Sequence, residues 1–460
     1  MRRINIIFWL IYILIIILFL GFGIQAFEKM NLTLITIFLA SLCSLITFFE
    51  YEWGIYLLIV SMLFSPEILI AQLPKRDVVL RIDDILILVI TLTWLARVAI
   101  MKNLQYLVFT PVHRPFFIFI AASLFSTAFG ILNGYIDSAT RGFLYVVKFF
   151  EFFMIFFLTV NVINSDRVLI RALNFYFITF TGIILYVVIS QPFMELGIRV
   201  TAPFEGKVGE PNTLGGYLAF SFIILLSIAL KNRNYFIRYL LMTITFLSLI
   251  PFLNTLSRGS YIAIAISLFA LFFMTDRKIS LLVFIVIATI VFSNYSVMAE
   301  KVINRIKETF IISPDGEYTR LILDESTRAR LNSYVDAVKL WRATPFLGRG
   351  ITGAIFIDGY FVRVLVEAGV VGLFSIVYTL YSVFRVARNL VKNIELNDLQ
   401  IGLVQGFIAG FLGLIGHSAG ANTFLIVRIS GSFWIMAGMI GYLYLKHFYE
   451  QKNITHHYTA

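Results

Sequence analysis

Repeated apolar runs of about 20 residues are the feature of this sequence that most limits its fold. A run of that length spans a hydrocarbon core of about 30 Å as an α-helix. Backbone polar groups within lipid must be satisfied inside each segment, and a β-barrel would instead show alternating stretches of about ten residues. With 60% hydrophobic and 14% charged residues, a soluble chain of 460 residues could not hide its apolar surface. The sequence therefore predicts an all-α, polytopic transmembrane helical bundle.

About 12–14 spans are expected from the apolar runs, with the softest boundaries among the first four. The first run follows Met1-Arg2-Arg3, is too long for the apolar core of a signal peptide and lacks a small-residue cleavage site. We therefore expect an uncleaved anchor there. The expected spans begin near Ile4, Leu32, Gly54, Ile85, Pro115, Phe143, Val168, Leu214, Phe236, Ser260, Ile279, Tyr360, Ile401 and Phe424.

The basic residues of the short loops predict the orientation, because such residues favour the cytoplasmic side. With the N-terminus inside, the alternation is consistent from the seventh span onward, whereas Lys75, Arg76 and Arg81 run against it. Both termini are therefore expected inside. The basic residues expected in cytoplasmic loops and the tail are Lys102, Arg114, Arg167, Arg171, Lys231, Arg233, Arg238, Arg277, Lys278, Arg385, Arg388, Lys392, Lys446 and Lys452.

This orientation leaves one long extracytoplasmic loop, and it sets the expected organisation of the chain. Residues 1–298 would carry the first transmembrane helices, 299–358 the loop, 359–446 the C-terminal spans and 447–460 a cytoplasmic tail. Within the loop, Ser326 to Arg342 has helical periodicity, with apolar or aromatic side chains recurring on one face. Such a helix could lie on the membrane, cap a cavity or pack within a subdomain. The recurring residues are Leu331, Tyr334, Val338 and Trp341.

Several kinds of chemistry find no support in the sequence. Cys43 is the single cysteine, so no disulfide can form within the chain. The five histidines match no common metal motif, and no phosphate-binding glycine loop or nucleic-acid surface is apparent. We therefore predict no metal, no cofactor and no nucleic-acid partner. The net charge of +11 is compatible with a bound anion.

Two arginines lie in short loops on the expected outer side. Arg199 precedes a stretch rich in glycine and proline that includes Glu210 and Asn212, where Asn212 or Thr213 could cap the following helix. Arg258 lies beside Gly259 in a very short connection between two spans. Arginine forms bidentate bonds to phosphate and keeps its charge when partly desolvated, so both could hold an anion. The alternative is that each merely extends from an interfacial loop towards water.

Two further groups carry charge near the outer end of the C-terminal spans. Arg363 and Glu367 are four residues apart and share one helix face, and Asp358 lies about one turn before them. This ion pair could bind substrate or could only fix packing. His417 is expected at an outer helix end with Arg428 a few turns further on, and a structural role is favoured for this histidine.

Four segments in order resemble the O-antigen polymerase and ligase family of membrane proteins. They are GEPNTLGGYLAF, NTLSRGSY, LNSYVDAVKLWRATPFLGRG and DGYFVRVLVEAGVVG, and they cover about Arg199 to Leu373. The shared pattern is an asparagine before a span, a Ser-Arg-Gly connection, a tryptophan followed by Pro-x-x-Gly-x-Gly, and a Glu-x-Gly-x-x-Gly close.

The resemblance implies a helical membrane enzyme that transfers glycans from an undecaprenyl-pyrophosphate donor without a metal. It also implies a lipid-linked glycan acceptor and contact with membrane lipids, and a chain-length regulator is a candidate further partner. Ligases of the family typically carry His-Asn nine residues before the glutamate, where this chain has Asp358 and Gly359 before Glu367. A polymerase of O-antigen or a related surface polysaccharide is therefore favoured over a ligase acting on lipid A-core.

We form a mechanistic hypothesis that gives these outer residues roles. Arg199, Arg258 and Arg363 would hold the donor pyrophosphate, and Arg258 would stabilise the leaving charge. Asp358 or Glu210 would accept the acceptor's proton, with Asn212, Glu367, His417 and Arg428 in support. The active site would face the periplasm from the bacterial inner membrane. A transporter or flippase for an anionic lipid-linked substrate and a non-enzymatic assembly scaffold are the alternatives.

Overall fold

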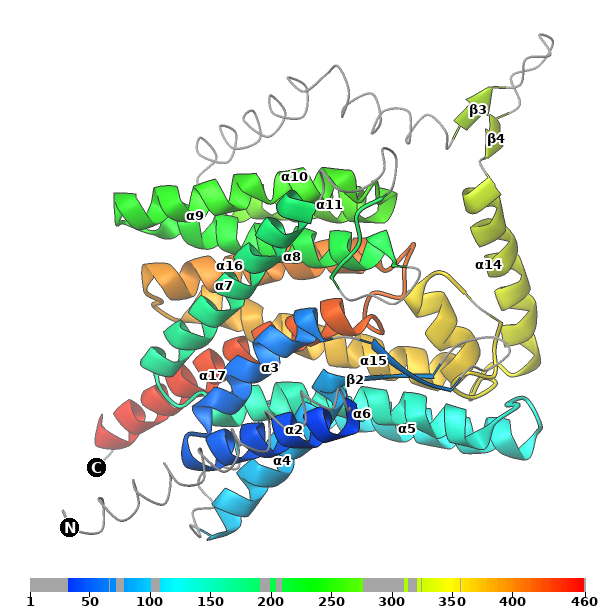
Figure 1. Ribbon diagram of the computed structural model, residues 1–460, viewed down its shortest axis with the longest axis horizontal. Helices are drawn as coiled ribbons and strands as arrows, with labels where there is room; N and C mark the ends of the chain where they lie inside the picture. Colours follow the sequence, from blue (N-terminus) through cyan, green and yellow to red (C-terminus); the bar gives the residue numbers. More distant parts are fainter. Residues whose placement is uncertain are drawn as a thin grey trace. The chain divides into compact units, whose positions relative to one another are not determined.

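The computed structural model describes most of the chain in two compact units, residues 1–107 and 108–460 (Figure 1). The predicted helical bundle is confirmed, and two short β-hairpins occur that the sequence did not predict. The described ranges are 32–65, 67–71, 78–100, 108–190, 199–203, 209–275, 310–312, 321–323, 325–355 and 357–458. The spans expected near Ile4 and Ile279 begin outside these ranges.

The first unit contains three helices and one hairpin. They are α2 (Leu32–Phe49), α3 (Glu52–Phe64), β1 (Glu67–Ala71), β2 (Val78–Arg81) and α4 (Ile82–Ile100), and β1 pairs antiparallel with β2. Arg81 lies 2.9 Å from the carboxylate of Asp83, and both side chains are buried. Its guanidinium also donates to the carbonyl of Met62. Because this cation is neutralised inside the unit, it has little weight as a topology signal.

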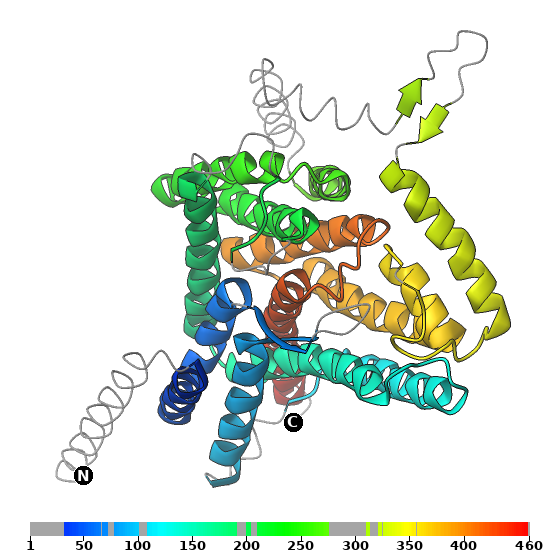
Figure 2. The ribbon, with the colours of Figure 1, turned by 45° about the vertical axis from the view of Figure 1, so that its right-hand side comes forward.

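The second unit holds the remaining described helices and a second antiparallel hairpin (Figure 2). The helices are α5 (His113–Leu132), α6 (Ala139–Val162), α7 (Asp166–Ser190), α8 (Pro211–Lys231), α9 (Tyr235–Leu247), α10 (Leu249–Asn254), α11 (Arg258–Met274), α14 (Glu325–Ala343), α15 (Tyr360–Asn393), α16 (Asp398–His417) and α17 (Val427–Tyr458). The strands are β3 (Phe310–Ile312) and β4 (Leu321–Leu323).

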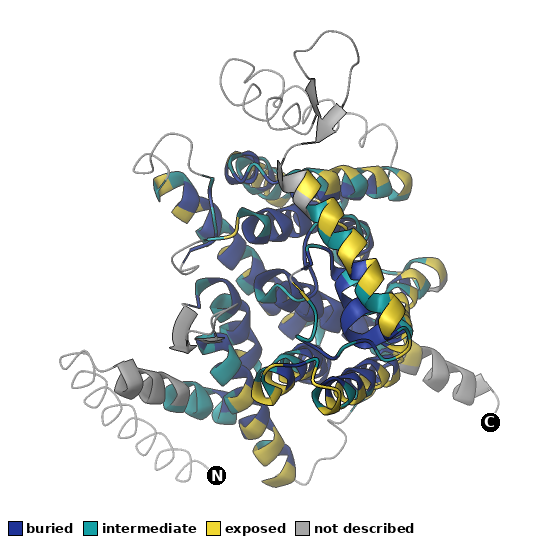
Figure 3. Ribbon diagram, turned by 90° about the vertical axis from the view of Figure 1, so that its right-hand side faces the viewer, coloured by how far each residue is buried: buried dark blue, intermediate teal, exposed yellow. Residues whose placement is uncertain are grey.

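Seven helices within the described ranges are long and apolar enough to cross a membrane, so the chain is a multi-pass membrane protein. One of them combines α9 and α10, which are separated by a turn at Ser248. The apolar window of α8 is completely buried, and this makes α8 the central helix of the second unit. The buried residues of this unit occupy its interior, whereas α14 carries an exposed outer face (Figure 3).

Glycines explain the close packing of α16 on α8. Gly402, Gly406 and Gly410 recur every four residues, so they lie on one face of α16. A Cβ added at Gly402 would come 2.8 Å from the Cα of Ile228, and one at Gly406 equally close to the Cα of Ile224. Small residues at this spacing let two membrane helices approach closely, which fixes α16 against the central helix.

The helix predicted from Ser326 to Arg342 is present as α14, from Glu325 to Ala343. Its packed face differs from the prediction, because Leu331 is 46% exposed and Val338 is 41% exposed. Ala337 is buried against Ile357 and Val366, and the packed face continues through Tyr334, Leu340 and Trp341. Alanine is too small to stand out in a periodic pattern of large apolar side chains, so the sequence did not indicate this face. The helix is thus packed against α15 through this narrower face.

Candidate functional site

The N-termini of α8 and α11 are joined by a side-chain hydrogen bond. The hydroxyl of Ser257 donates to Oδ1 of Asn212 over 2.7 Å and accepts from the backbone N–H of Ser260, so it caps α11. Glu210 is the N-cap of α8 and makes no side-chain cap bond. The expected capping of α8 by Asn212 or Thr213 is therefore wrong. With Pro211 in the first turn, the helix begins earlier than expected. The Asn212 side chain instead accepts a hydrogen bond from Ser257, the N-cap of the neighbouring helix α11.

Arg199 binds the backbone that leads out of α10. Its Nε donates to the carbonyl of Thr255 over 2.9 Å and its Nη2 to the carbonyl of Leu256 over 3.2 Å. These carbonyls follow the C-terminus of a helix, where partial negative charge favours a cation. Leu256 has φ of 49°, a conformation that is uncommon for a residue other than glycine. The contacts hold the guanidinium beside the Ser257–Arg258 connection.

Arg258 is the first residue of α11 and is partly buried. The first turns of α11 and α8 carry N–H groups without intrahelical acceptors, and the helix dipoles add positive potential there. Because Asn212 and Ser257 hold these two N-termini together, both dipoles act on the region that Arg199 and Arg258 border. Helix N-termini with adjacent arginines are well suited to bind an anion.

His417 closes this region from the end of α16. Its side chain is completely buried, with Nδ1 2.8 Å from the hydroxyl of Thr423 and Nε2 3.3 Å from the hydroxyl of Ser260. Gly216 of α8 lies so close that an added Cβ would come 3.0 Å from the imidazole. Both ring nitrogens thus face hydroxyl groups of the protein. The structural role favoured for this histidine stays a prediction.

The start of α15 is tied to the connection between α16 and α17. The backbone N–H of Tyr360 donates to the carbonyl of Ser418 over 3.0 Å, and the amide of Asn422 donates to the carbonyl of Ile357 over 2.9 Å. His417 is the residue before Ser418. The chain around Asp358 is therefore linked to the end of α16 that also contacts α11.

Tyr334 fastens α14 onto the same segment. Its hydroxyl donates to the carbonyl of Asp358 over 2.7 Å and also contacts the carbonyl of Ala419. The carboxylate of Asp358 lies 3.4 Å from Nε of Arg330, with both side chains partly exposed. Burial raises the pKa of the Tyr334 phenol, the nearby Arg330 opposes that rise and Asp358 adds to it. The phenol therefore stays protonated at neutral pH and acts as a donor.

Arg363 and Glu367 form a buried ion pair on α15. The distance from Nε to Oε1 is 3.0 Å, and the side chains are 6% and 4% exposed. The same carboxylate oxygen accepts from the backbone N–H of Thr352 over 3.3 Å. The Arg363 guanidinium also lies over the ring of Tyr145 on α6. These contacts fix the direction of the guanidinium, and Glu367 is already engaged by two donors.

The Pro-x-x-Gly-x-Gly turn fills a break in α15. The helix is interrupted at Gly369, where φ is 67° and ψ is −168°. The N–H groups of Arg349 and Gly350 donate to the carbonyls of Val366 and Glu367 over 3.0 and 2.8 Å. In return, the N–H groups after the break donate to carbonyls of the turn: Val370 to Pro345 and Val371 to Phe346. The third and fourth motifs are thus one structural unit, because each satisfies the backbone groups that the other exposes.

Arg428 lies near the start of α17 and is 1% exposed. Its neighbour Ile429 packs where a side chain on Gly216 of α8 would have to lie. Arg428 therefore belongs to the buried interior beside α8, whereas Glu210 is exposed at the N-cap of α8.

The structure connects most of the expected residues through two chains of contacts. One runs from Arg199 through the Thr255–Arg258 segment to Asn212 and His417. The other joins Arg363 to Glu367 on α15, which begins two residues after Asp358. The Ser418–Asn422 segment joins them. Ser257, Arg330 and Tyr334 were not predicted as site residues. Ser257 belongs to the Ser-Arg-Gly motif and Tyr334 to the amphipathic pattern, but neither signal indicated their partners.

No cluster of three or more histidine, cysteine, aspartate or glutamate residues with the geometry of a metal site occurs in the part of the chain that the structure describes. The polar groups brought together are mainly arginines, hydroxyls and helix N-termini. Such an arrangement can bind an oxyanion and stabilise negative charge that develops on it.

Comparison with known families gives a match to the family model described as O-antigen ligase, over residues 243–377. The matched region runs from α9 through Arg258, α14, the Pro-x-x-Gly-x-Gly turn and the break in α15. This match confirms the resemblance to the O-antigen polymerase and ligase family. No curated protein sequence matches the chain.

Proposed function

We propose that the chain polymerises undecaprenyl-pyrophosphate-linked repeat units. The match of residues 243–377 to the O-antigen ligase family supports a membrane enzyme of the O-antigen ligase or polymerase type. The product is O-antigen or a related surface polysaccharide. The reaction takes place at the periplasmic face of the inner membrane, with lipid-linked donor and acceptor glycans and without a metal. A chain-length regulator is a further proposed partner.

One observation carries the proposal: Arg199 and Arg258 border the joined N-termini of α8 and α11. This arrangement suits a pyrophosphate, because guanidinium groups and helix N-termini both favour phosphate oxygens. Arg199 has five N–H donors, and the two bonds to Thr255 and Leu256 fix its plane before substrate arrives. Hydrogen-bond donors that are oriented before substrate binds need little reorganisation during the reaction.

The proposed reaction is an inverting glycosyl transfer. The acceptor hydroxyl oxygen forms a bond to the anomeric carbon of the donor, and the bond from that carbon to the pyrophosphate oxygen breaks. The electron pair leaves with undecaprenyl pyrophosphate, whose charge is stabilised by Arg199, Arg258 and Arg363. The hydroxyl proton passes to Asp358 or Glu210. Glu367 is the weaker candidate, because Arg363 and the N–H of Thr352 already bind its carboxylate.

Asp358 favours a polymerase over a ligase, since it stands where ligases of the family typically carry histidine. The ligase remains the second candidate, because the matched family is described as O-antigen ligase. Purified protein incubated with a lipid-linked repeat unit, with and without lipid A-core, separates them. We expect a ladder of products without lipid A-core. Transfer only in its presence would establish the ligase, and no product with a verified native substrate would favour a transporter or scaffold.

Replacement of Arg258 tests the site itself. Arg258→Ala should lower the turnover rate by about 30- to 1,000-fold, corresponding to about 2–4 kcal/mol of lost transition-state stabilisation. Arg342→Ala is the matched control, because this exposed arginine lies in the last turn of α14. Polymer yield and length would be measured alongside the thermal unfolding midpoint. Unchanged polymer from a folded Arg258→Ala protein would contradict the assignment.

A further inference from the structure

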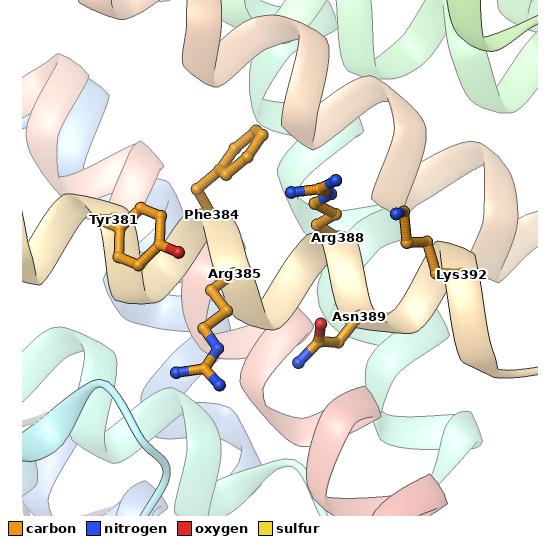
Figure 4. A pocket seen from close by; sticks show the side chains of 6 residues that line it. All are labelled: Tyr381, Phe384, Arg385, Arg388, Asn389 and Lys392. Atoms are coloured by element: carbon orange, nitrogen blue, oxygen red, sulfur yellow. The ribbon is translucent and has the colours of Figure 1, made fainter.

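A cationic cavity of about 270 Å³ lies on the last turns of α15 (Figure 4). It is lined by Tyr381, Phe384, Arg385, Arg388, Asn389 and Lys392. The lining residues recur every three or four positions, so they form one stripe along the helix. The three cations are exposed. In Figure 4, Arg388 and Lys392 extend to the side of Phe384, and Arg385 and Asn389 extend to the other.

Among the described residues, no carboxylate forms a salt bridge with Arg385, Arg388 or Lys392. The nearest acidic residues in sequence are Glu395 and Asp398, and Asp398 already pairs with Arg233 over 2.6 Å. Three like charges within two helical turns repel one another unless an anion lies between them. The helix dipole favours cations only in the last turn, which leaves Arg385 and Arg388 without that support.

The position of the cavity along α15 indicates its surroundings. The candidate membrane span Tyr360–Lys392 includes the three cations in its last turns. The end of a spanning helix lies at the level of the lipid headgroups, so the cations fall there. Tyr381, 55% exposed one turn earlier, has the position expected of an interfacial aromatic residue.

We propose that this cavity, which we call the α15 basic groove, binds the phosphate of an anionic phospholipid headgroup. Arg385 and Arg388 bond the phosphate oxygens from opposite sides of the stripe, since guanidinium groups match phosphate geometry. Lys392 adds a third charge, and Tyr381 and Phe384 border the acyl chains. The volume is just below that of pockets for drug-sized ligands, as suits a single headgroup. Basic pockets beside membrane helices commonly bind such headgroups.

Nanodiscs of phosphatidylcholine with increasing phosphatidylglycerol test the groove. The measurements are the thermal unfolding midpoint and the phosphatidylglycerol retained after detergent extraction. Arg385→Gln with Arg388→Gln should weaken retention roughly thirtyfold and remove the rise in midpoint. The matched control is Arg167→Gln with Arg171→Gln, which removes the same charge from the start of α7. The control should behave as the unmodified protein.

Two outcomes would overturn the proposal. One is an equal loss in both double variants, because the effect would then be general surface charge. The other is an equal midpoint rise with inorganic phosphate in phosphatidylcholine nanodiscs, because the ligand would then be a free anion. If the glutamine variant does not fold, Arg385→Lys with Arg388→Lys keeps the charge but loses the bidentate geometry. Retention that is weakened but not abolished would support the groove, and unchanged retention would refute it.

Discussion

The two segments of α15 on either side of Gly369 hold their arginines in opposite environments. In the first segment, Arg363 is buried, paired with Glu367 and packed over Tyr145. In the second, Arg385 and Arg388 are exposed and form no ion pair among the described residues. A buried charge must be paired to be tolerated, whereas an exposed charge can remain hydrated.

This difference separates an arginine with a fixed direction from arginines that can reorient. Arg363 has one defined direction, which suits a group that must meet a reacting pyrophosphate. Arg385 and Arg388 can follow the headgroup of a mobile lipid, and their binding is expected to depend on salt. Arginines on one helix thus lie in two environments, and the two proposed roles follow this difference in burial.

The largest expected effect comes from a side chain placed at Gly369, in the break that divides the two segments. Gly369→Ala places a Cβ on a residue with φ of 67°, where it would overlap the carbonyl of Phe346. We expect a loss of about 4–5 kcal/mol or more, enough to prevent folding. Yield of monodisperse protein and its unfolding midpoint would show this. Gly420→Ala is the control, because no atom lies within 4 Å of its added Cβ. A stable Gly369→Ala protein would mean that the break is dispensable.

Removing one member of the buried pair is the next largest change. Glu367→Ala leaves Arg363 as an uncompensated buried charge and should cost about 3–5 kcal/mol. Replacing both residues by methionine should be close to neutral for stability, because the unpaired charge is absent. The double variant should nevertheless lose polymerisation if Arg363 holds the pyrophosphate. Full activity in a stable double variant would show that the pair only fixes packing.

A smaller effect is expected where α14 is fastened to the start of α15. Tyr334→Phe removes the donor to the carbonyls of Asp358 and Ala419, and should cost about 1–2 kcal/mol. The raised pKa of this phenol means that the folded protein holds the proton more tightly than the unfolded chain. Its contribution is therefore fully present below the usual value near 10 and is lost as pH rises through the folded-state value.

The unfolding midpoints of Tyr334→Phe and the unmodified protein should therefore differ by a constant amount from pH 7 to 9 and converge at higher pH. Ser333 offers a control, because its hydroxyl bonds only locally to the carbonyl of Arg330. Ser333→Ala should show no such convergence. Because phenylalanine keeps the ring, a gap that persists above the folded-state pKa would show that the hydrogen bonds donated by the phenol are not its cause.

Much of the fold could be predicted because lipid imposes a simple rule on the sequence. Apolar runs of span length predicted the helices, and the order of four motifs indicated the resemblance to the O-antigen polymerase and ligase family. The break at Gly369 could not be predicted, because its backbone groups are satisfied by a turn about twenty residues earlier. Similarly, Arg199 and Ser257 can be read in the sequence, but their hydrogen-bond acceptors lie in other elements. Partners distant in sequence are set by packing and leave no local pattern.

The smallest expected effect concerns a partnered arginine that is exposed rather than buried. Arg233 precedes α9 and pairs with Asp398 at the start of α16, with 87% and 40% of the side chains exposed. Solvent screens such a pair, so Arg233→Gln should change stability by less than about 1 kcal/mol. Asn397→Ala at the same helix start is a useful contrast, because it removes a capping box and should cost about 1 kcal/mol. If Arg233→Gln proved as damaging as Glu367→Ala, burial would not be what distinguishes the arginines of this protein.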